Sequence, residues 1–149
     1  MVLTIAPTQS CNFACTYCFE KWRQSGALSN RTEDAIINYI KHLKQEDGLE
    51  SVNLTWYGGE PLLQYKRVIS LARRIDELGL KINENLLITN GYFFTPEVVE
   101  KLVEAKISEI QITLDGFRET HDIRRPLING KGTFDTIIKN LDDYYNSRF

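Results

Sequence analysis

Three cysteines, Cys11, Cys15 and Cys18, lie in one short run, and the 149-residue chain contains no others. An odd number cannot pair completely, and clustered thiols of a reducing compartment more often bind metal than form disulfides. A tetrahedral zinc site would need a fourth ligand, and both histidines, His42 and His121, are distant in the sequence. A cubane iron–sulfur cluster normally takes four cysteines, so three would leave one iron open to a small molecule. The spacing favours such a cluster; a zinc site completed by histidine and a set of reduced buried thiols are the alternatives.

The other unusual loops each follow the end of a predicted strand. They contain the sequences Gly58-Gly59-Glu60-Pro61, Asn90-Gly91, Asp115-Gly116, His121-Asp122 and Arg124-Arg125. In parallel α/β folds, ligands bind at the carboxyl ends of the strands. These loops and the cysteine loop are therefore expected to lie on one rim and to form a single site.

Strand and helix patterns alternate along the chain and must position these loops. Apolar runs and period-two alternation predict strands at residues 2–6, 52–57 and 109–114, and another that ends at 86–89. Helical spacing of apolar residues predicts helices at 32–47, 65–78, 95–105 and from 133 onward. Thr32 is the expected cap of the first helix, Gly79 the expected stop of the second, and Thr95-Pro96 the expected start of the third.

The strand pattern also indicates the kind of sheet. Strands that alternate with helices imply parallel pairing through right-handed crossovers. Fully buried parallel strands read as continuous apolar runs, but apolar and polar residues alternate within residues 52–57 and 110–115. One face of such a sheet suits a helix layer, and the other suits a polar cavity. The pattern therefore favours an α/β fold of the partial (β/α) barrel type, with helices outside only, over an open doubly wound sheet.

Several motifs resemble those of one enzyme family. Residues 8–20, TQSCNFACTYCFE, resemble the cluster loop of radical S-adenosylmethionine (SAM) enzymes. More narrowly, they are similar to the peptide-modifying, SPASM-associated maturases that include the anaerobic sulfatase-maturating enzymes. Residues 56–62, 89–91, 112–116 and 121–134 resemble the later motifs of these maturases, in the expected order. The resemblance covers nearly the whole chain, and the cysteine motif is its most specific part.

The resemblance implies cofactors and a reaction. A [4Fe–4S] cluster would be held by Cys11, Cys15 and Cys18, and SAM would chelate its open iron. Reduction of the cluster would cleave SAM to methionine and a 5′-deoxyadenosyl radical, which abstracts hydrogen from a peptide or protein substrate. The modification could be a thioether or another crosslink, or oxidation of a side chain to formylglycine. Cofactor-binding roles are implied for Tyr17, Gly58, Gly59, Glu60, Asn90, Thr113 and Arg125.

Residue chemistry is compatible with these roles and leaves alternatives open. Glu60 could pair with the ammonium group of SAM, or it could belong to a turn that ends a strand. Arg125 could hold the SAM carboxylate bidentately, or it could be a solvated loop residue. Thr113 suits a ribose or carboxylate contact, and is otherwise a strand former. Tyr17 could contact SAM through its backbone or ring, or it could be a buried aromatic residue.

The residues after the third and fourth strands have further possible roles. Asn90 and Asp115 each precede a glycine, so each could shape a turn instead of binding a ligand. Asp115 could also face the substrate, and it is the one candidate catalytic residue. His121 and Asp122 are expected to hydrogen-bond each other and to order the loop that presents Arg125.

The domain organisation follows from the same resemblance, which implies a core of about six strand–helix units. Four are visible here, so residues 1–149 are expected to be the N-terminal part of a radical SAM core. The chain would be a fragment, or one half of a split or dimeric enzyme, and a second chain or a missing C-terminal segment would complete the barrel. No cysteine follows Cys18, so the chain supplies no auxiliary cluster. The competing functions are an iron–sulfur electron-transfer or sensing module and a catalytically incomplete binding module.

Composition restricts the partners. The 18 Lys and Arg residues face 20 Asp and Glu residues, so no basic nucleic-acid footprint is visible. No apolar run approaches the roughly 20 residues of a membrane span, and the N-terminus has no secretory signal pattern. We expect a cytoplasmic protein whose partners are a peptide or protein substrate and an electron donor such as flavodoxin or ferredoxin.

Overall fold

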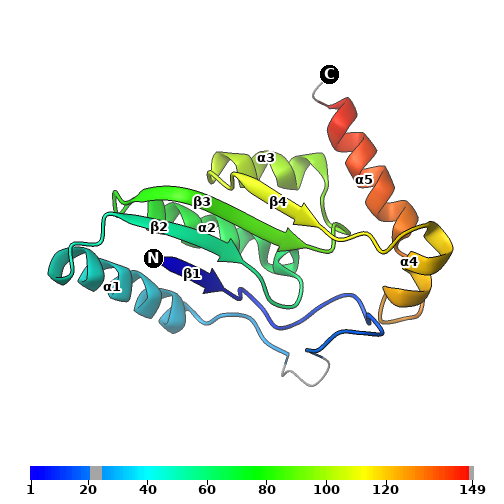
Figure 1. Ribbon diagram of the computed structural model, residues 1–149, viewed down its shortest axis with the longest axis horizontal. Helices are drawn as coiled ribbons and strands as arrows, with labels where there is room; N and C mark the ends of the chain where they lie inside the picture. The colour runs from blue at the N-terminus through cyan, green and yellow to red at the C-terminus, as the bar shows by residue number, and fades with distance from the viewer. Residues whose placement is uncertain (21–24, 148–149) are drawn as a thin grey trace.

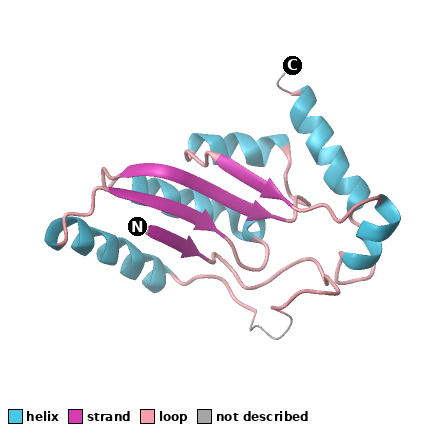
Figure 2. Cartoon of the chain, in the orientation of Figure 1, coloured by secondary structure: helices cyan, strands magenta, loops and turns pink. Residues whose placement is uncertain are grey.

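One parallel sheet of four strands organises the chain, of which the computed structural model describes residues 1–20 and 25–147. The strands are β1 (Val2–Ile5), β2 (Ser51–Trp56), β3 (Lys81–Thr89) and β4 (Glu109–Ile112), and they lie side by side in this order (Figure 2). Ile5 pairs with Trp56, and Thr89 pairs with Ile112. The carboxyl ends of all four strands therefore meet at one edge of the sheet.

Each crossover between neighbouring strands carries a helix. α1 (Asn30–Glu46), α2 (Tyr65–Asp76) and α3 (Pro96–Glu104) follow β1, β2 and β3, and a 3-10 turn, η1 (Pro61–Gln64), precedes α2. α4 (Arg118–Arg124) and α5 (Phe134–Asn146) follow β4. Sequential strand order with right-handed crossovers puts the connecting helices on one face, where α2 contacts both α1 and α3. Figure 1 shows α2 behind the strands. This single helix layer confirms the predicted partial (β/α) barrel and excludes the doubly wound alternative.

β2 supplies the centre of the core through every second residue. Val52, Leu54 and Trp56 are completely buried and belong to one apolar cluster with the inner face of α2. Burial of each such side chain stabilises the fold by roughly 1.5–3 kcal/mol. The indole Nε1 of Trp56 donates a hydrogen bond to Asn85 Oδ1 at 2.8 Å, so this large ring is buried with its polar atom paired.

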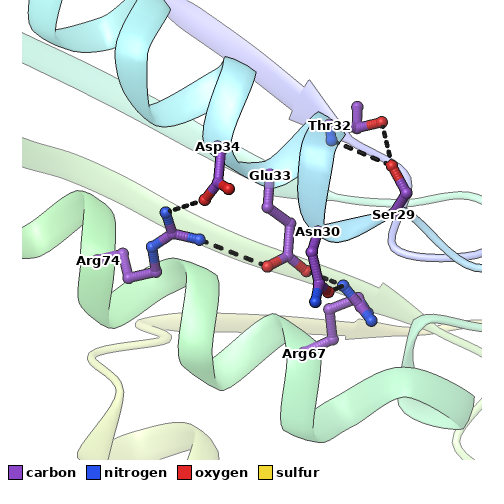
Figure 3. Close-up of polar contacts among 7 residues, drawn as sticks. All are labelled: Ser29, Asn30, Thr32, Glu33, Asp34, Arg67 and Arg74. Carbon is purple, nitrogen blue, oxygen red and sulfur yellow. Dashed lines mark hydrogen bonds and ion pairs between the residues drawn. The ribbon is translucent and has the colours of Figure 1, made fainter.

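Arginines of α2 link α2 to α1 through ion pairs with acidic residues in the first turn of α1 (Figure 3). Glu33 is only 6% exposed; it accepts a hydrogen bond from Arg67 and forms a 3.5 Å ion pair with Arg74. Arg74 also pairs with Asp34 at 2.6 Å, and Arg67 donates to Asn30 at 3.1 Å. These contacts fix the start of α1, and hence the end of the loop that leads from the cysteines into it.

Helix boundaries follow local sequence signals, with one correction. Thr95 caps α3 by accepting a backbone N–H of the first turn, and Gly79 (φ +68°) stops the α2 segment, as predicted. α1 begins at Asn30, earlier than predicted, because Ser29 and not Thr32 is its cap. The Ser29 hydroxyl oxygen accepts from the N–H of Thr32 at 3.1 Å, which satisfies a donor of the first turn.

Across the described residues, no helix is both long enough and apolar enough to cross a bilayer.

The chain leaves the sheet earlier at β4 than predicted. β4 ends at Ile112 rather than at residue 114, and Leu114, which was expected on the apolar face, is 41% exposed. Beyond the strand, the chain turns and enters α4, which has only seven residues. Apolar periodicity did not indicate α4, because two turns of helix are too short to display it.

The buried Glu33 carboxylate leads to a prediction for stability. In Glu33→Gln, Arg67 and Arg74 keep their charges and lose the carboxylate that joins them. Because these two side chains are 26% and 34% exposed, water offsets part of the loss. We expect the free energy of unfolding, measured in urea, to fall by about 1–2 kcal/mol. Glu104→Gln removes an exposed pair with Arg73 and should change it by less than about 0.5 kcal/mol. Equal effects of the two substitutions would contradict the proposed link between α1 and α2 through Glu33.

Candidate functional site at the carboxyl edge of the sheet

A cavity opens at the carboxyl edge of the sheet, between the loops that follow the four strands. Its lining includes Cys11, Phe13, Cys15, Tyr17, Cys18, Gly58, Gly59, Ile88, Thr89, Asn90, Thr113 and Arg125. A second cavity, of about 500 Å³, is lined by the same three cysteines together with Phe13, Gln9, Ser10 and Ile128. The structure therefore brings the predicted loops together on one rim. Of the predicted cofactor-binding residues, Glu60 alone is absent from the lining of the first cavity.

The cysteine loop is held by backbone hydrogen bonds to a distant segment. Ala14 N donates to Pro126 O and Thr16 N to Arg124 O, both at 2.8 Å, and Ile128 N donates to Asn12 O at 3.1 Å. Residues 12–16 therefore run antiparallel beside residues 124–128, the segment that follows α4. The conformation of the thiol-bearing loop depends on residues more than a hundred positions later in the chain.

The three thiols are partly buried and form no disulfide. The backbone N–H of Phe13 donates to Cys11 Sγ at 3.4 Å. Burial raises the pKa of the Cys15 thiol, and the positive charge of Arg125 opposes this shift. Within the described part of the chain, no three Cys, His, Asp or Glu side chains converge as ligands of one metal ion.

The Gly-Gly-Glu loop packs its backbone directly against the cysteine loop. Gly59 N donates to Thr8 O at 3.0 Å, and Glu60 N donates to Ser10 O at 2.9 Å. A Cβ atom on Gly59 would lie 2.0 Å from Ser10 O. A Cβ atom on Gly58, whose φ is +136°, would lie 2.7 Å from Thr8 O. Only glycine fits at these two positions, because the backbones approach too closely for any side chain.

The Glu60 side chain, a predicted contact of the cofactor, is completely buried. Its Oε1 accepts from Leu62 N at 2.9 Å and from Thr89 Oγ1 at 2.6 Å, and its Oε2 accepts from Asn90 N at 2.8 Å. Burial raises the pKa of this carboxyl, and the three donors oppose the shift. The carboxylate thus caps η1 and joins the end of β2 to the end of β3. Both the predicted contact with the ammonium group of SAM and the alternative role in a strand-ending turn stay predictions.

Asn90 shapes a turn and also reaches the cysteine loop. Its Oδ1 accepts from Tyr92 N at 3.0 Å, which is the turn that the following glycine predicted. Its Nδ2 donates to Asn12 Oδ1 at 2.8 Å and lies 4.0 Å from Cys11 Sγ. The end of β3 is thereby tied to the first cysteine.

Arg125, Tyr17, Asp115 and Arg124 form a charged cluster beside the cavity. Arg125 Nη1 donates to Tyr17 Oη at 2.7 Å and lies 3.8 Å from Asp115 Oδ1. Arg124 Nε donates to Asp115 Oδ2 at 3.0 Å, and its guanidinium lies 4.9 Å from the centroid of the Tyr17 ring. Arg125 is 9% exposed and Tyr17 is 47% exposed. Arg125 is therefore not a solvated loop residue, and Tyr17 is not a buried aromatic.

Asp115 is ionised by its neighbours rather than poised as a base. Partial burial acts to raise its pKa, but the hydrogen bond from Tyr17 and the charges of Arg125 and Arg124 outweigh burial and lower the pKa. Asp115 itself is absent from the lining of the first cavity, whereas Thr113, two residues earlier, lies on it. Asp115 therefore belongs to the charged cluster through its pairs with Arg124 and Arg125, and its role as a catalytic residue stays a prediction.

His121 and Asp122 do not bond to each other as predicted, but both hold the start of α5. Asp122 Oδ1 accepts from Thr133 N at 2.7 Å and from Phe134 N at 2.9 Å. Partial burial acts to raise the pKa of Asp122, and these two donors outweigh it and lower the pKa. His121 Nε2 pairs with Thr133 Oγ1 at 3.1 Å. Both side chains meet in Thr133, which sequence reasoning did not single out.

Two more residues of the site lie in the motifs at residues 8–20 and 89–91, but no individual role was predicted for them. Thr89 lines the cavity and donates to the buried Glu60 carboxylate. Phe13 is 6% exposed, and its ring centroid lies 5.9 Å from the Arg125 guanidinium. Thr89 ends a predicted strand at the rim, and Phe13 lies between two cysteines, so position alone could have indicated both.

Comparison with known proteins places these features in one family. The family model of the radical SAM superfamily matches residues 5–149. The chain is 30% identical over 120 residues to the S-adenosylmethionine-dependent nucleotide dehydratase of Fibrobacter sp. (strain UWH6), a match that covers 78% of this chain and 34% of that enzyme. It is 31% identical over 142 residues to the serine-type anaerobic sulfatase-maturating enzyme of Klebsiella aerogenes, covering 89% of this chain and 34% of that enzyme. It is 32% identical over 145 residues to the GTP 3′,8-cyclase of Haemophilus influenzae (strain PittGG), covering 94% and 40%. The chain thus spans less than half the length of these relatives.

Solved structures share the fold. Native anSMEcpe with bound AdoMet superposes with a TM-score of 0.79 and 25% identity, over 99% of this chain and 41% of that chain. Native anSMEcpe with bound AdoMet and Kp18Cys peptide gives a TM-score of 0.78 and 26% identity, over the same shares. The hydrogenase maturase HydG of Carboxydothermus hydrogenoformans, at 14% identity and a TM-score of 0.68, covers 99% of this chain and 34% of that chain and shows the fold alone.

The close approach at Gly59 leads to a second prediction. In Gly59→Ala, the new Cβ would overlap the backbone oxygen of Ser10, so the two loops must separate. We expect the free energy of unfolding to fall by about 1–3 kcal/mol in urea denaturation. Gly26→Ala is the matched control, because a Cβ there meets nothing within 4 Å, and it should change the value by less than about 0.5 kcal/mol. A Gly59→Ala protein as stable as the Gly26→Ala protein would show that the loops are not packed as described.

Proposed function

The chain belongs to the radical SAM superfamily, and on this premise we propose that residues 1–149 are the N-terminal part of the core of a radical SAM enzyme acting on a peptide or protein. Members of this superfamily use a [4Fe–4S] cluster and SAM. One observation carries the proposal: three thiols, a close-packed glycine backbone and a buried arginine all line a single cavity. A fold that served only to hold a cluster would not need the last two features.

The cysteine loop fits a [4Fe–4S] cluster better than a single metal ion. In a cubane each iron takes its own thiolate, so the ligands surround a body instead of meeting at one point. The three cysteines line the same two cavities, and among the described residues they do not converge on one ion position. Cys11, Cys15 and Cys18 would each hold one iron and leave the fourth for a small molecule.

Arg125 fits the carboxylate of SAM. It lines the cavity, and its buried Nε has no hydrogen-bond partner among the described residues. A buried donor without a partner costs about 1–3 kcal/mol, which an anion bound in the cavity would recover. Tyr17 and Asp115 already occupy or neutralise the Nη1 side. The free Nε therefore supports anion binding by this residue.

The remaining SAM contacts come from the other lining residues. Gly58 and Gly59 offer backbone atoms that no side chain screens, and Thr113 offers a hydroxyl for the ribose or the carboxylate. Tyr17 and Asn90 complete the lining near the cysteines. Glu60 acts as a positioning residue, since its buried carboxylate accepts three hydrogen bonds from protein donors.

When bound, the cluster would supply an electron for the reductive cleavage of SAM, and SAM would supply the 5′-deoxyadenosyl group that takes up a hydrogen atom of the substrate. The chain's own residues bind and orient these groups. The rings of Phe13 and Tyr17 line the same cavity as the thiols. No residue described here is required as a base, and the ionised Asp115 is engaged by two arginines.

A peptide or protein is the proposed substrate class. A sulfatase-maturating relative and the peptide-bound anSMEcpe structure support it. The relatives named as a nucleotide dehydratase and a GTP cyclase match this chain at similar identity, so a nucleotide is the second candidate. We further propose a cytoplasmic enzyme that receives electrons from flavodoxin or ferredoxin, since thiols stay reduced there. A further segment or a second chain would complete the barrel.

Anaerobic reconstitution with iron and sulfide tests the proposal. We expect about four irons per chain and, after dithionite and SAM are added, equal amounts of 5′-deoxyadenosine and methionine. A stable cluster without SAM cleavage would favour the competing functions, an electron-transfer module or a catalytically incomplete core. Stimulation of cleavage by a cysteine-containing peptide but not by GTP would support the peptide class, and the reverse would overturn it.

Cys15→Ala tests the cluster ligands. Loss of one of three thiolates should remove most of the bound iron, measured by iron analysis and by the visible absorption of the reconstituted protein. Thr16→Ala, in the same loop and with an exposed side chain, is the control and should retain the iron of the wild type. Unchanged iron content in Cys15→Ala would refute the cluster assignment.

Arg125→Ala tests the SAM carboxylate contact. A charge-assisted bond contributes about 1.5–3 kcal/mol, so the Kd for SAM should rise by about ten- to a hundredfold in isothermal titration of the reconstituted protein. Arg118→Ala, which removes an exposed ion pair with Asp135, is the control and should leave the Kd unchanged. A Kd unaffected by Arg125→Ala would exclude this arginine as the carboxylate contact.

A further inference from the structure

A one-way chain of hydrogen bonds runs through the buried ring of His121. The backbone N–H of Asp115 donates to His121 Nδ1 at 3.2 Å. A backbone N–H can only donate, so Nδ1 carries no proton and Nε2 must carry it. Nε2 then donates to Thr133 Oγ1 at 3.1 Å, and the Thr133 hydroxyl donates to the carbonyl oxygen of Arg125 at 2.8 Å. The direction of every bond in the chain is thereby set.

The two ends of this chain are the two residues that carry the charges of the site. Asp115 N lies at one end and Arg125 O at the other, and their side chains form the ion pair beside Tyr17. Arg125 is also bonded at its N–H, which donates to His121 O at 2.7 Å. That bond is the backbone bond at the end of α4 and does not involve the ring, so the His121 side chain acts on the carbonyl side of Arg125, through Thr133.

We propose that His121 is a positioning residue which, as a neutral ring, ties Arg125 to Asp115 and so holds the arginine in the cavity for an anionic ligand. The inference rests on the proposed role of Arg125 and adds the group that places it. His121 itself lines neither cavity of the cysteine loop.

The surroundings of His121 keep the ring neutral. The ring is completely buried, and Phe134 lies edge-on to it at 5.6 Å between centroids. Burial and then the charge of Arg125 lower the pKa of His121, against the opposing charges of Asp122 and Asp115. A doubly protonated ring would also turn Nδ1 into a donor that faces the N–H of Asp115. Protonation would therefore break the first bond of the chain.

NMR of the protein labelled with ¹⁵N-histidine tests the ring directly. The chain has two histidines, of which His42 is exposed and His121 is buried. In the oxidised reconstituted protein, we expect the His121 signals to show the Nε2–H tautomer and to remain unchanged as the pH falls from about 7.5 to about 5.5. Protonation of the His121 ring within this range, or an Nδ1–H tautomer, would overturn the proposal.

Thr133 offers a matched pair of variants. Thr133→Val keeps the shape of the buried side chain and removes the hydroxyl that joins the ring to Arg125, whereas Thr133→Ser keeps the hydroxyl. We expect the Kd for SAM to rise about tenfold in Thr133→Val and to stay within about twofold in Thr133→Ser, since only the first variant breaks the buried hydrogen bond to Arg125 O. Equal Kd values for the two variants would overturn the proposal.

A double-mutant cycle separates positioning from a general loss of structure. In the Arg125→Ala background there is no guanidinium to position, so Thr133→Val should weaken SAM binding no further. The same tenfold loss in both backgrounds would show that Thr133 acts through stability alone, and would refute the proposal. A wild type that binds no SAM, or an Arg125→Ala protein that binds it normally, would instead refute the proposed function, and the NMR result would still report on the linkage.

Discussion

The site depends on backbone hydrogen bonds to a loop that has no secondary structure of its own. Residues 8–10 are paired with residues 58–60, and residues 12–16 are paired with residues 124–128. The cysteine loop therefore lies between two segments that come from the far ends of β2 and β4. Side-chain contacts could not impose this shape alone, because the donors and acceptors of an irregular loop need partners of their own when they leave water. The positions of the thiols therefore depend on contacts with the segments after β2 and β4, and not only on the local sequence around the cysteines.

A buried carboxylate is the second constraint, and it acts between strands. Burying a charged group is unfavourable unless hydrogen bonds replace water, and Glu60 has three donors from two different loops. This arrangement joins β2 to β3 at the edge where the cavity opens. It also explains why glycines precede Glu60: the side chain turns inward while the backbone of Gly58 and Gly59 presses on the cysteine loop. In this structure, the Gly-Gly-Glu motif therefore joins the loops that form the edge of the cavity.

Local signals in the sequence were sufficient for the fold, and insufficient for the partners within the site. Strand alternation around Trp56 predicted the single helix layer, and Thr95-Pro96 predicted the start of α3, because these signals depend on a few neighbouring residues. The cap of α1 was misplaced because Ser29 and Thr32 are equally good capping residues and packing chooses between them. The partner of His121 could not be predicted, since Thr133 comes into reach only after α4 has formed. The residue types indicated which loops form the site. The contacts between side chains of different loops could be identified only from the tertiary structure.

The positive charge of one guanidinium, that of Arg125, influences the pKa values of several groups in the site. The charge of Arg125 acts to lower the pKa of Cys15, Tyr17, Glu60, Asp115 and His121. Burial is the larger effect at Cys15, Tyr17 and Glu60, and their pKa values are raised overall. Because the influence of a charge depends on distance, the guanidinium must be held in place for its effect on these groups to persist. A neutral histidine meets that need better than a second acidic residue would, since it fixes the backbone of Arg125 and leaves the charge of the arginine available to a ligand.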